Sequence, residues 1–267
     1  MQQLSGDLDT DSQPPLAVPF AHFVIGVAIL LIGGAIAGLG SFVPGIDPAG
    51  AGSLHLLLAG WIGLTIMGAM TQFVPVWSGT SLYSRRLSVA SLWLVTLGVA
   101  GLVAGFLFEY AWLPIGASVL LLGFWTFAYN IVRTLPAART FDITEAHFAF
   151  ALASLLVATV LGWLLAVDIA FRVLGGRIAP SRLVLSHLTL TVFGFVFATI
   201  VGALYQLAPM FTQAEKTAAD AHLAHVEMVA LPGGIALLAA GRLLGSTRVG
   251  TFGGVVFLTG ALAFSGF

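Results

Sequence analysis

The sequence of 267 residues contains no cysteine, and only 8% of its residues are charged. The lack of cysteine excludes disulfides, thiolate metal sites and cysteine-bound iron–sulfur clusters. A transition metal would have to be bound by histidine, carboxylate, methionine or carbonyl groups. Soluble domains carry about a quarter charged residues, whereas 59% of this chain is hydrophobic, so we expect it to reside in a lipid bilayer. A net charge of −1 gives no reason to expect a nucleic-acid partner.

The N-terminus also lacks the basic residues that precede the hydrophobic region of a secretory signal peptide. Its residues are polar and acidic, with Asp7, Asp9 and Asp11. We therefore expect residues 1–18 to form a short disordered acidic tail. The last hydrophobic segment reaches Phe267 without a polar flank, which leaves open a natural continuation of the chain.

Long hydrophobic runs fill the rest of the sequence. A membrane helix needs about 20 mainly apolar residues. The sequence therefore predicts an all-α polytopic protein that crosses the plasma or inner membrane of the cell several times. Start signals support several of these helices. Asp47 can cap the second helix, and Pro48 and Pro180 suit the first turns of the second and the sixth. Asp142-x-x-Glu145 resembles a capping box that opens the fifth. The eight predicted helices cover residues 19–41, 48–76, 87–108, 112–134, 143–170, 180–210, 218–243 and 248–267.

The second and sixth predicted helices share one pattern. It reads Pro48-x6-His55, Gly60-x7-Gly68-Ala69-x2-Gln72-x2-Pro75 in one and Pro180-x6-His187, Gly194-x7-Gly202-Ala203-x2-Gln206-x2-Pro209 in the other. The Pro-to-His parts are offset by 132 residues and the Gly-to-Pro parts by 134, so two residues are inserted between them. Each pattern ends with a glutamine and a proline, where we expect the helix to end.

A second match widens this repeat. Ala21-His22-Phe23 opens the first predicted helix, and Ala146-His147-Phe148 opens the fifth. This indicates two tandem four-helix units, 19–134 and 143–267, within one transmembrane domain. An even number of helices gives both units the same orientation, related by a pseudo-twofold axis along the membrane normal. The basic residues do not set that orientation, because five lie on each side of the predicted membrane.

His55 and His187 are the main candidates for a cofactor site. Both are predicted to lie about 10 Å along their helices, at one depth in the membrane. Two imidazoles facing each other are the axial ligands of a six-coordinate b-type heme, and Gly60 and Gly194 would give a porphyrin room. The alternative is that the histidines form hydrogen bonds with neighbouring helices, while the glycines allow close helix packing.

The other four histidines and Glu227 are predicted to lie on the opposite side of the membrane. His222 and His225 are three residues apart on one helix and are close enough to chelate a metal. With His22, His147 and Glu227 they are candidates for a second site that binds heme or copper. The alternatives are interfacial histidines, and a Glu227 that relays protons or pairs with His225 or an arginine.

The residues around the two histidines resemble a known family. His55-Leu-Leu-Leu-Ala-Gly-Trp-Ile-Gly-Leu-Thr-Ile-Met-Gly-Ala-Met, with Gln72 and Pro75, is similar to proteins related to subunit I of heme–copper oxidases and nitric-oxide reductases. Ser186-His187-Leu-Thr-Leu-Thr-Val-Phe-Gly fits the same pattern. In that family four-helix arcs carry metal-binding histidine on their second helix, and the resemblance implies heme binding by His55 and His187.

The chain also departs from the family. It has two predicted arcs instead of three, and it lacks the adjacent histidine pair that holds copper. His225-Val-Glu227 lacks the proline of the family's His-Pro-Glu. The resemblance therefore implies a heme protein in electron transfer or in handling O2 or NO, an oxidoreductase only with a partner subunit. A redox partner, an additional subunit or a second copy would complete it. The alternative is a heme-free transport protein or metal-binding accessory protein on the same scaffold.

Overall fold

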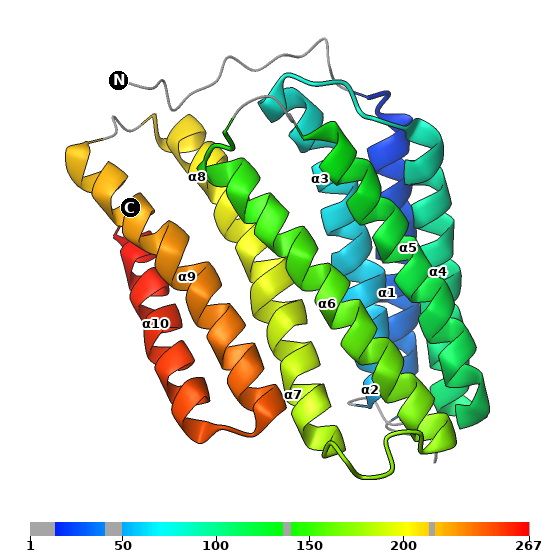
Figure 1. Cartoon of the computed structure of the whole chain (residues 1–267). Helices are drawn as coiled ribbons and strands as arrows, with labels where there is room; N and C mark the ends of the chain where they lie inside the picture. Colours follow the sequence, from blue (N-terminus) through cyan, green and yellow to red (C-terminus); the bar gives the residue numbers. More distant parts are fainter. Residues whose placement is uncertain (1–13, 41–49, 136–139, 214–216, 267) are drawn as a thin grey trace. The chain divides into compact units, whose positions relative to one another are not determined.

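The computed structural model describes residues 14–40, 50–135, 140–213 and 217–266. Within these ranges the chain is helical and contains no strand. Figure 1 shows the helices, eight of which are long and apolar enough to cross a membrane. The chain is therefore an all-α polytopic membrane protein, as the sequence predicts. These spans are Ala17–Gly40, Ala51–Ser78, Arg85–Leu107, Tyr110–Thr134, Ile143–Phe171, Pro180–Thr212, Ala218–Leu244 and Thr247–Ser265.

The second and sixth spans are each built from three pieces, because a π-helical segment interrupts the α-helix. In such a segment the backbone hydrogen bonds reach one residue further than in an α-helix, and π turns are frequent at functional sites. The elements are α1 (Ala17–Gly40), α2 (Ala51–His55), η2 (Leu56–Gly63), α3 (Leu64–Ser78), α4 (Arg85–Leu107), η3 (Tyr110–Trp112), α5 (Leu113–Thr134), α6 (Ile143–Phe171), α7 (Pro180–Thr189), η4 (Leu190–Phe197), α8 (Ala198–Thr212), α9 (Ala218–Leu244) and α10 (Thr247–Ser265).

Several helix starts agree with the sequence signals. At the start of α6 the backbone N–H of Asp142 donates to Glu145 Oε2 at 3.1 Å, and the N–H of Glu145 donates to Asp142 Oδ1 at 2.8 Å, which confirms the capping box. α7 begins at Pro180. α1 begins at Ala17, two residues before its predicted start, while residues 1–13 of the predicted tail, like Asp47 and Pro48, lie outside the described residues.

The prolines of the repeated pattern do not end their helices. α3 continues through Pro75 to Ser78, and α8 continues through Pro209 to Thr212. A proline inside a helix removes one backbone hydrogen bond but does not by itself stop the chain from continuing. Both helices end instead in the left-handed conformation, at Gly79 with φ 62° and Gln213 with φ 51°.

The chain divides into two compact units, and each is described by itself. The first contains α1 to α5 together with Trp163–Leu174 from the end of α6; the second contains the earlier part of α6 and α7 to α10. The first unit thus includes a segment beyond the predicted boundary. Trp163 contributes to this grouping, because its Nε1–H donates to Ser118 Oγ on α5 at 2.9 Å.

In each unit the last two helices form a hairpin held together at glycines. The hairpins are α4–α5 and α9–α10, and α9 and α10 lie side by side in Figure 1. A Cβ at Gly98 on α4 would collide with the backbone of Leu120, and one at Gly234 on α9 with the backbone of Phe257. The glycines of the two hairpins are offset by 136 residues, so similarity between the units reaches the helices that the sequence repeat did not cover.

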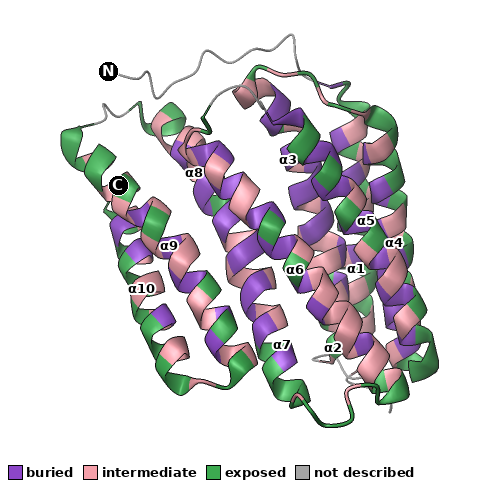
Figure 2. Cartoon of the chain, viewed as in Figure 1, coloured by how far each residue is buried: buried purple, intermediate pink, exposed green. Residues whose placement is uncertain are grey.

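The outward faces of the spans are apolar. On α10, exposed side chains recur every three or four residues and therefore lie on one face of the helix. Figure 2 shows α10 with exposed bands along its length. Such a face is suited to contact with lipid. Its exposed large side chains are Phe252, Val255, Leu258 and Leu262.

Candidate functional site

The four histidines inside the first, second, fifth and sixth spans each form the same kind of hydrogen bond. In each, Nδ1 lies close to a backbone carbonyl oxygen. The distances are 2.9 Å from His22 to Val18, 2.7 Å from His55 to Ala51, 2.7 Å from His147 to Ile143 and 2.8 Å from His187 to Ala158. A carbonyl only accepts, so Nδ1–H donates in every case. In the neutral imidazole Nε2 then carries the lone pair, the arrangement found in metal-binding histidines.

His55 stands at the junction of α2 and η2. Its carbonyl partner belongs to its own helix, one turn earlier. Its half-buried ring lies 5.9 Å from the ring of Phe106 on α4. Within the first unit, His55 is therefore directed toward α4.

His187 is held by a different helix of its unit. Its carbonyl partner, Ala158, lies on α6, and the ring packs over Gly162 of the same helix. A Cβ at position 162 would lie 2.9 Å from Cε1 of the imidazole, so the ring position depends on this glycine. Gly162 was not predicted from the sequence, because only the packing of α7 on α6 brings it to the histidine.

The two histidines are not at equivalent places in their helices. The π-helical segments η2 and η4 are offset by 134 residues, but the histidines are offset by 132. His55 directly precedes η2, whereas Leu188 and Thr189 separate His187 from η4. Two residues turn an α-helix by about 200°, which agrees with one ring facing α4 and the other α6. The prediction that both lie at one depth and share a ligand stays a prediction.

Gly60 and Gly194, predicted to border a porphyrin, lie against neighbouring helices of their own units. A Cβ at Gly60 would lie 2.6 Å from Cγ2 of Ile29 on α1, and one at Gly194 would lie 2.6 Å from Cβ of Ser154 on α6. Small residues let helix backbones approach closely in membranes. These glycines allow close packing of the helices within their units, and their predicted place beside a porphyrin stays a prediction.

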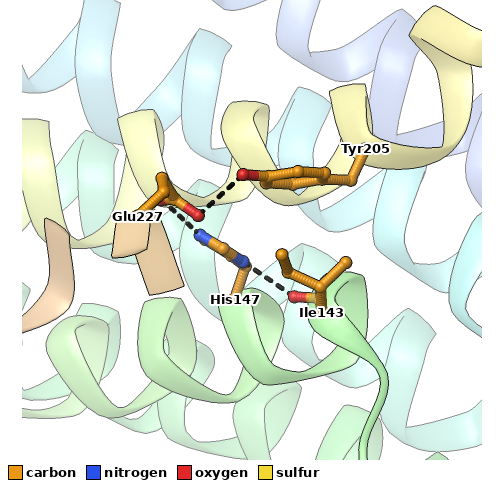
Figure 3. Close-up of polar contacts among 4 residues, drawn as sticks. All are labelled: Ile143, His147, Tyr205 and Glu227. Carbon is orange, nitrogen blue, oxygen red and sulfur yellow. Dashed lines mark hydrogen bonds and ion pairs between the residues drawn. The ribbon is translucent and has the colours of Figure 1, made fainter. Parts of the chain in front are cut away.

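Three buried side chains of the second unit form one hydrogen-bonded group, which we call the triad: His147 on α6, Tyr205 on α8 and Glu227 on α9. Figure 3 shows them converging. His147 Nε2 lies 2.9 Å from Glu227 Oε1, and the Tyr205 hydroxyl donates to Glu227 Oε2 at 3.0 Å. His147 and Glu227 are both 0% exposed. The partner of Glu227 is thus His147, and not His225 or an arginine.

The triad holds a proton between two of its members. His147 Nδ1–H already donates to the carbonyl of Ile143. The contact between His147 Nε2 and Glu227 therefore needs one further proton, either on the imidazole as an ion pair or on the carboxyl group as a neutral pair. In both forms the pair has no net charge, which a buried site requires. Tyr205 was not predicted, although it follows Gly202 by three residues on the same helix face.

The residues predicted for a second metal site separate into different surroundings. His147 and Glu227 belong to the triad, whereas His222 and His225 are exposed near the start of α9. His22 lies in the first unit. Across the described ranges, no three histidine or acidic side chains converge as they would around a metal ion.

Comparison with known proteins adds no family to these observations. No protein-family model matches the sequence, and no curated protein matches it. The functional assignment therefore depends on the repeat and on the geometry within each unit.

Proposed function

We propose that this chain is a heme-binding membrane protein in which His55 and His187 would supply the imidazoles that hold a b-type heme. The observation that carries the proposal is the hydrogen bond from Nδ1–H of each ring to a backbone carbonyl. It fixes the ring orientation and increases the basicity of Nε2, as the outer partners of metal-bound histidines do. The repeat adds that both residues stand on the second helix of a four-helix unit.

The residues of the chain have separate parts in this proposal. His55 and His187 would hold the iron. The carbonyls of Ala51 and Ala158 orient the two rings, and Gly162 keeps space for the ring of His187. The bound heme would supply one-electron chemistry, with a potential tuned by its ligands and burial. The resemblance to heme–copper oxidases supports a role in electron transfer or in handling O2 or NO, in the cell membrane and with a redox partner, a further subunit or a second copy.

Heme content tests the proposal. The protein is expressed with ample heme, purified in mild detergent and examined by its reduced-minus-oxidised optical spectrum. We expect a b-type Soret and α-band that is lost or strongly shifted in His55→Ala and in His187→Ala. The exposed His222→Ala and His225→Ala serve as matched controls and should keep the bands. A colourless wild-type protein would refute the proposal.

The triad favours a second candidate, a heme-free transport protein on the same scaffold. A proton-holding His147–Glu227 pair inside a membrane span is the kind of group that marks proton pathways. In this case Glu227→Gln, which retains size but removes the acid, should abolish proton uptake by reconstituted vesicles. His55→Ala should leave this uptake unchanged.

A further inference from the structure

The first unit contains counterparts of all three members of the triad. His22 and His147 stand in the same Ala-His-Phe sequence. His22 packs against a glycine of the second span, and His147 packs against a glycine of the sixth span. A Cβ at Gly68 would lie 2.9 Å from Cβ of His22, and a Cβ at Gly202 would lie 2.6 Å from Cβ of His147. His22 is thus the counterpart of His147.

The other two counterparts follow from the same glycines. Thr71 comes three residues after Gly68, as Tyr205 comes three residues after Gly202. Ser91 comes seven residues before Gly98 on α4, as Glu227 comes seven residues before Gly234 on α9. Thr71 and Ser91 are both 0% exposed.

The ring of His22 lies at the level of Thr71 along the two helices. Side chains on a helix tilt toward its N-terminus, and the bond from Nδ1 to Val18 holds the ring of His22 one turn before its own Cα. α1 and the second span are consecutive and antiparallel, with Gly26 against Leu64 and His22 against Gly68. The ring therefore reaches the level of the turn after Gly68, where Thr71 lies.

Two polar atoms of this site are buried without a partner among the described residues, His22 Nε2 and Thr71 Oγ1. His22 is 1% exposed. The hydroxyl of Ser91 donates to the carbonyl of Ser88 at 3.0 Å, and its oxygen retains acceptor capacity. A buried polar group left without a hydrogen bond destabilises the folded state, so the site calls for a hydrogen-bonding ligand.

The chemistry of the three atoms limits that ligand. Nε2 of a neutral His22 accepts a hydrogen bond, and Thr71 can donate one. Serine in place of glutamate and threonine in place of tyrosine shorten two of the three side chains. Together the two shorter side chains occupy less volume by more than the roughly 30 Å³ that one water takes up in the liquid. None of the three residues is a carboxylate that would balance a buried cation.

We propose that the first unit binds ordered water between His22, Thr71 and Ser91, at the place that the carboxylate of Glu227 occupies in the second unit. The water donates to His22 Nε2 and accepts from Thr71 Oγ1–H. The two units thus provide equivalent buried histidines with different hydrogen-bond partners. His147 shares a proton with an acid, and His22 remains a neutral, hydrated base. The site is independent of the heme proposal, because it contains neither His55 nor His187.

Infrared spectroscopy of the purified full-length protein tests this site. Exchange into oxygen-18 water shifts the O–H stretching bands of internal water. We expect a shifted band in the wild type that is lost in Thr71→Val, a nearly isosteric change, and in Ser91→Glu, which introduces the carboxylate. Glu227→Gln in the second unit is the matched control and should keep the band. A band unchanged by both first-unit variants overturns the proposal, as does a co-purified metal ion that is lost in His22→Leu.

A double-mutant cycle gives a second readout. If the carboxylate of Ser91→Glu reaches His22, the two positions should be coupled by about tenfold in the unfolding equilibrium constant. The coupling is measured by combining Ser91→Glu with His22→Leu. Additive effects of the two changes would mean that the positions do not share a site, and this result also overturns the proposal.

Discussion

At the scale of the residue, the buried histidines are defined by what their two ring nitrogens meet. Nδ1 is bound to a carbonyl in all four spans that carry the repeat, so differences between the histidines arise at Nε2. In the triad, Nε2 of His147 meets Glu227, and Glu227 also accepts from Tyr205. Removal of Glu227 therefore leaves two buried polar groups unsatisfied at once.

Glu227→Leu should destabilise the second unit by about 3 kcal/mol, since removing one member of a buried pair strands the other. Glu227→Gln should cost only about 1 kcal/mol, because its amide can still form hydrogen bonds with His147 and Tyr205. Reversible unfolding in mild detergent measures both free energies. Equal losses would contradict the structural importance of the hydrogen bonds.

Gly162→Ala should displace the ring of His187, because the new Cβ would lie 2.9 Å from Cε1. If His187 binds iron, the heme affinity should fall about tenfold or more. Titration of the purified apoprotein with hemin gives this affinity. Gly254→Ala is the control, since a Cβ there meets nothing within 4 Å. Unchanged heme affinity in Gly162→Ala would argue against His187 as a ligand.

At the scale of the element, close helix approach depends on glycines at certain positions and not on glycine content. Neighbouring glycines on one helix can have opposite surroundings. A Cβ at Gly234 would collide with the backbone of Phe257, whereas one at Gly233 meets nothing within 4 Å. A backbone cannot move aside as a flexible side chain can, so the hairpin must open to accept a methyl group.

Gly234→Ala should therefore destabilise the α9–α10 hairpin by about 1–3 kcal/mol. Gly233→Ala should be neutral or stabilising by up to about 1 kcal/mol, because alanine favours the helix over glycine. The unfolding free energies of the two variants are compared under one condition. Similar values would show that the hairpin does not depend on this approach.

At the scale of the whole molecule, the chain changes sides of the membrane at each of its eight spans. Loops after odd-numbered spans therefore lie on one side, and loops after even-numbered spans lie on the other. The chain contains no cysteine, so single cysteines can report this directly. Ser81→Cys lies after the second span and Ala179→Cys after the fifth. An impermeant maleimide should label one of them in intact cells and the other in inverted vesicles. Labelling of both from one side would contradict the eight-span topology.

The sequence was sufficient for the features that depend on local pattern. Hydrophobic length predicted all eight spans, and Asp142 and Glu145 predicted the capping box of α6. Pro75 and Pro209 were misinterpreted as helix ends, because their helices continue to a left-handed residue beyond them.

Features that depend on contacts between helices could not be predicted from the sequence. Gly60 and Gly194 carry no sign in the sequence of what they pack against. Glu227 stood out as a buried acid, but its partner lies 80 residues away. Ser91 was not identified, because a serine in an apolar helix gives no signal until the glycines of the two hairpins are aligned.

The central claim is that two imidazoles of this chain bind one heme iron. Low-temperature electron paramagnetic resonance of the oxidised, heme-loaded protein tests it most directly. We predict a low-spin ferric signal of bis-imidazole ligation in the wild type, converted to high-spin iron in both His55→Ala and His187→Ala. A wild-type protein without heme iron, or a low-spin signal unchanged in either variant, would contradict the claim.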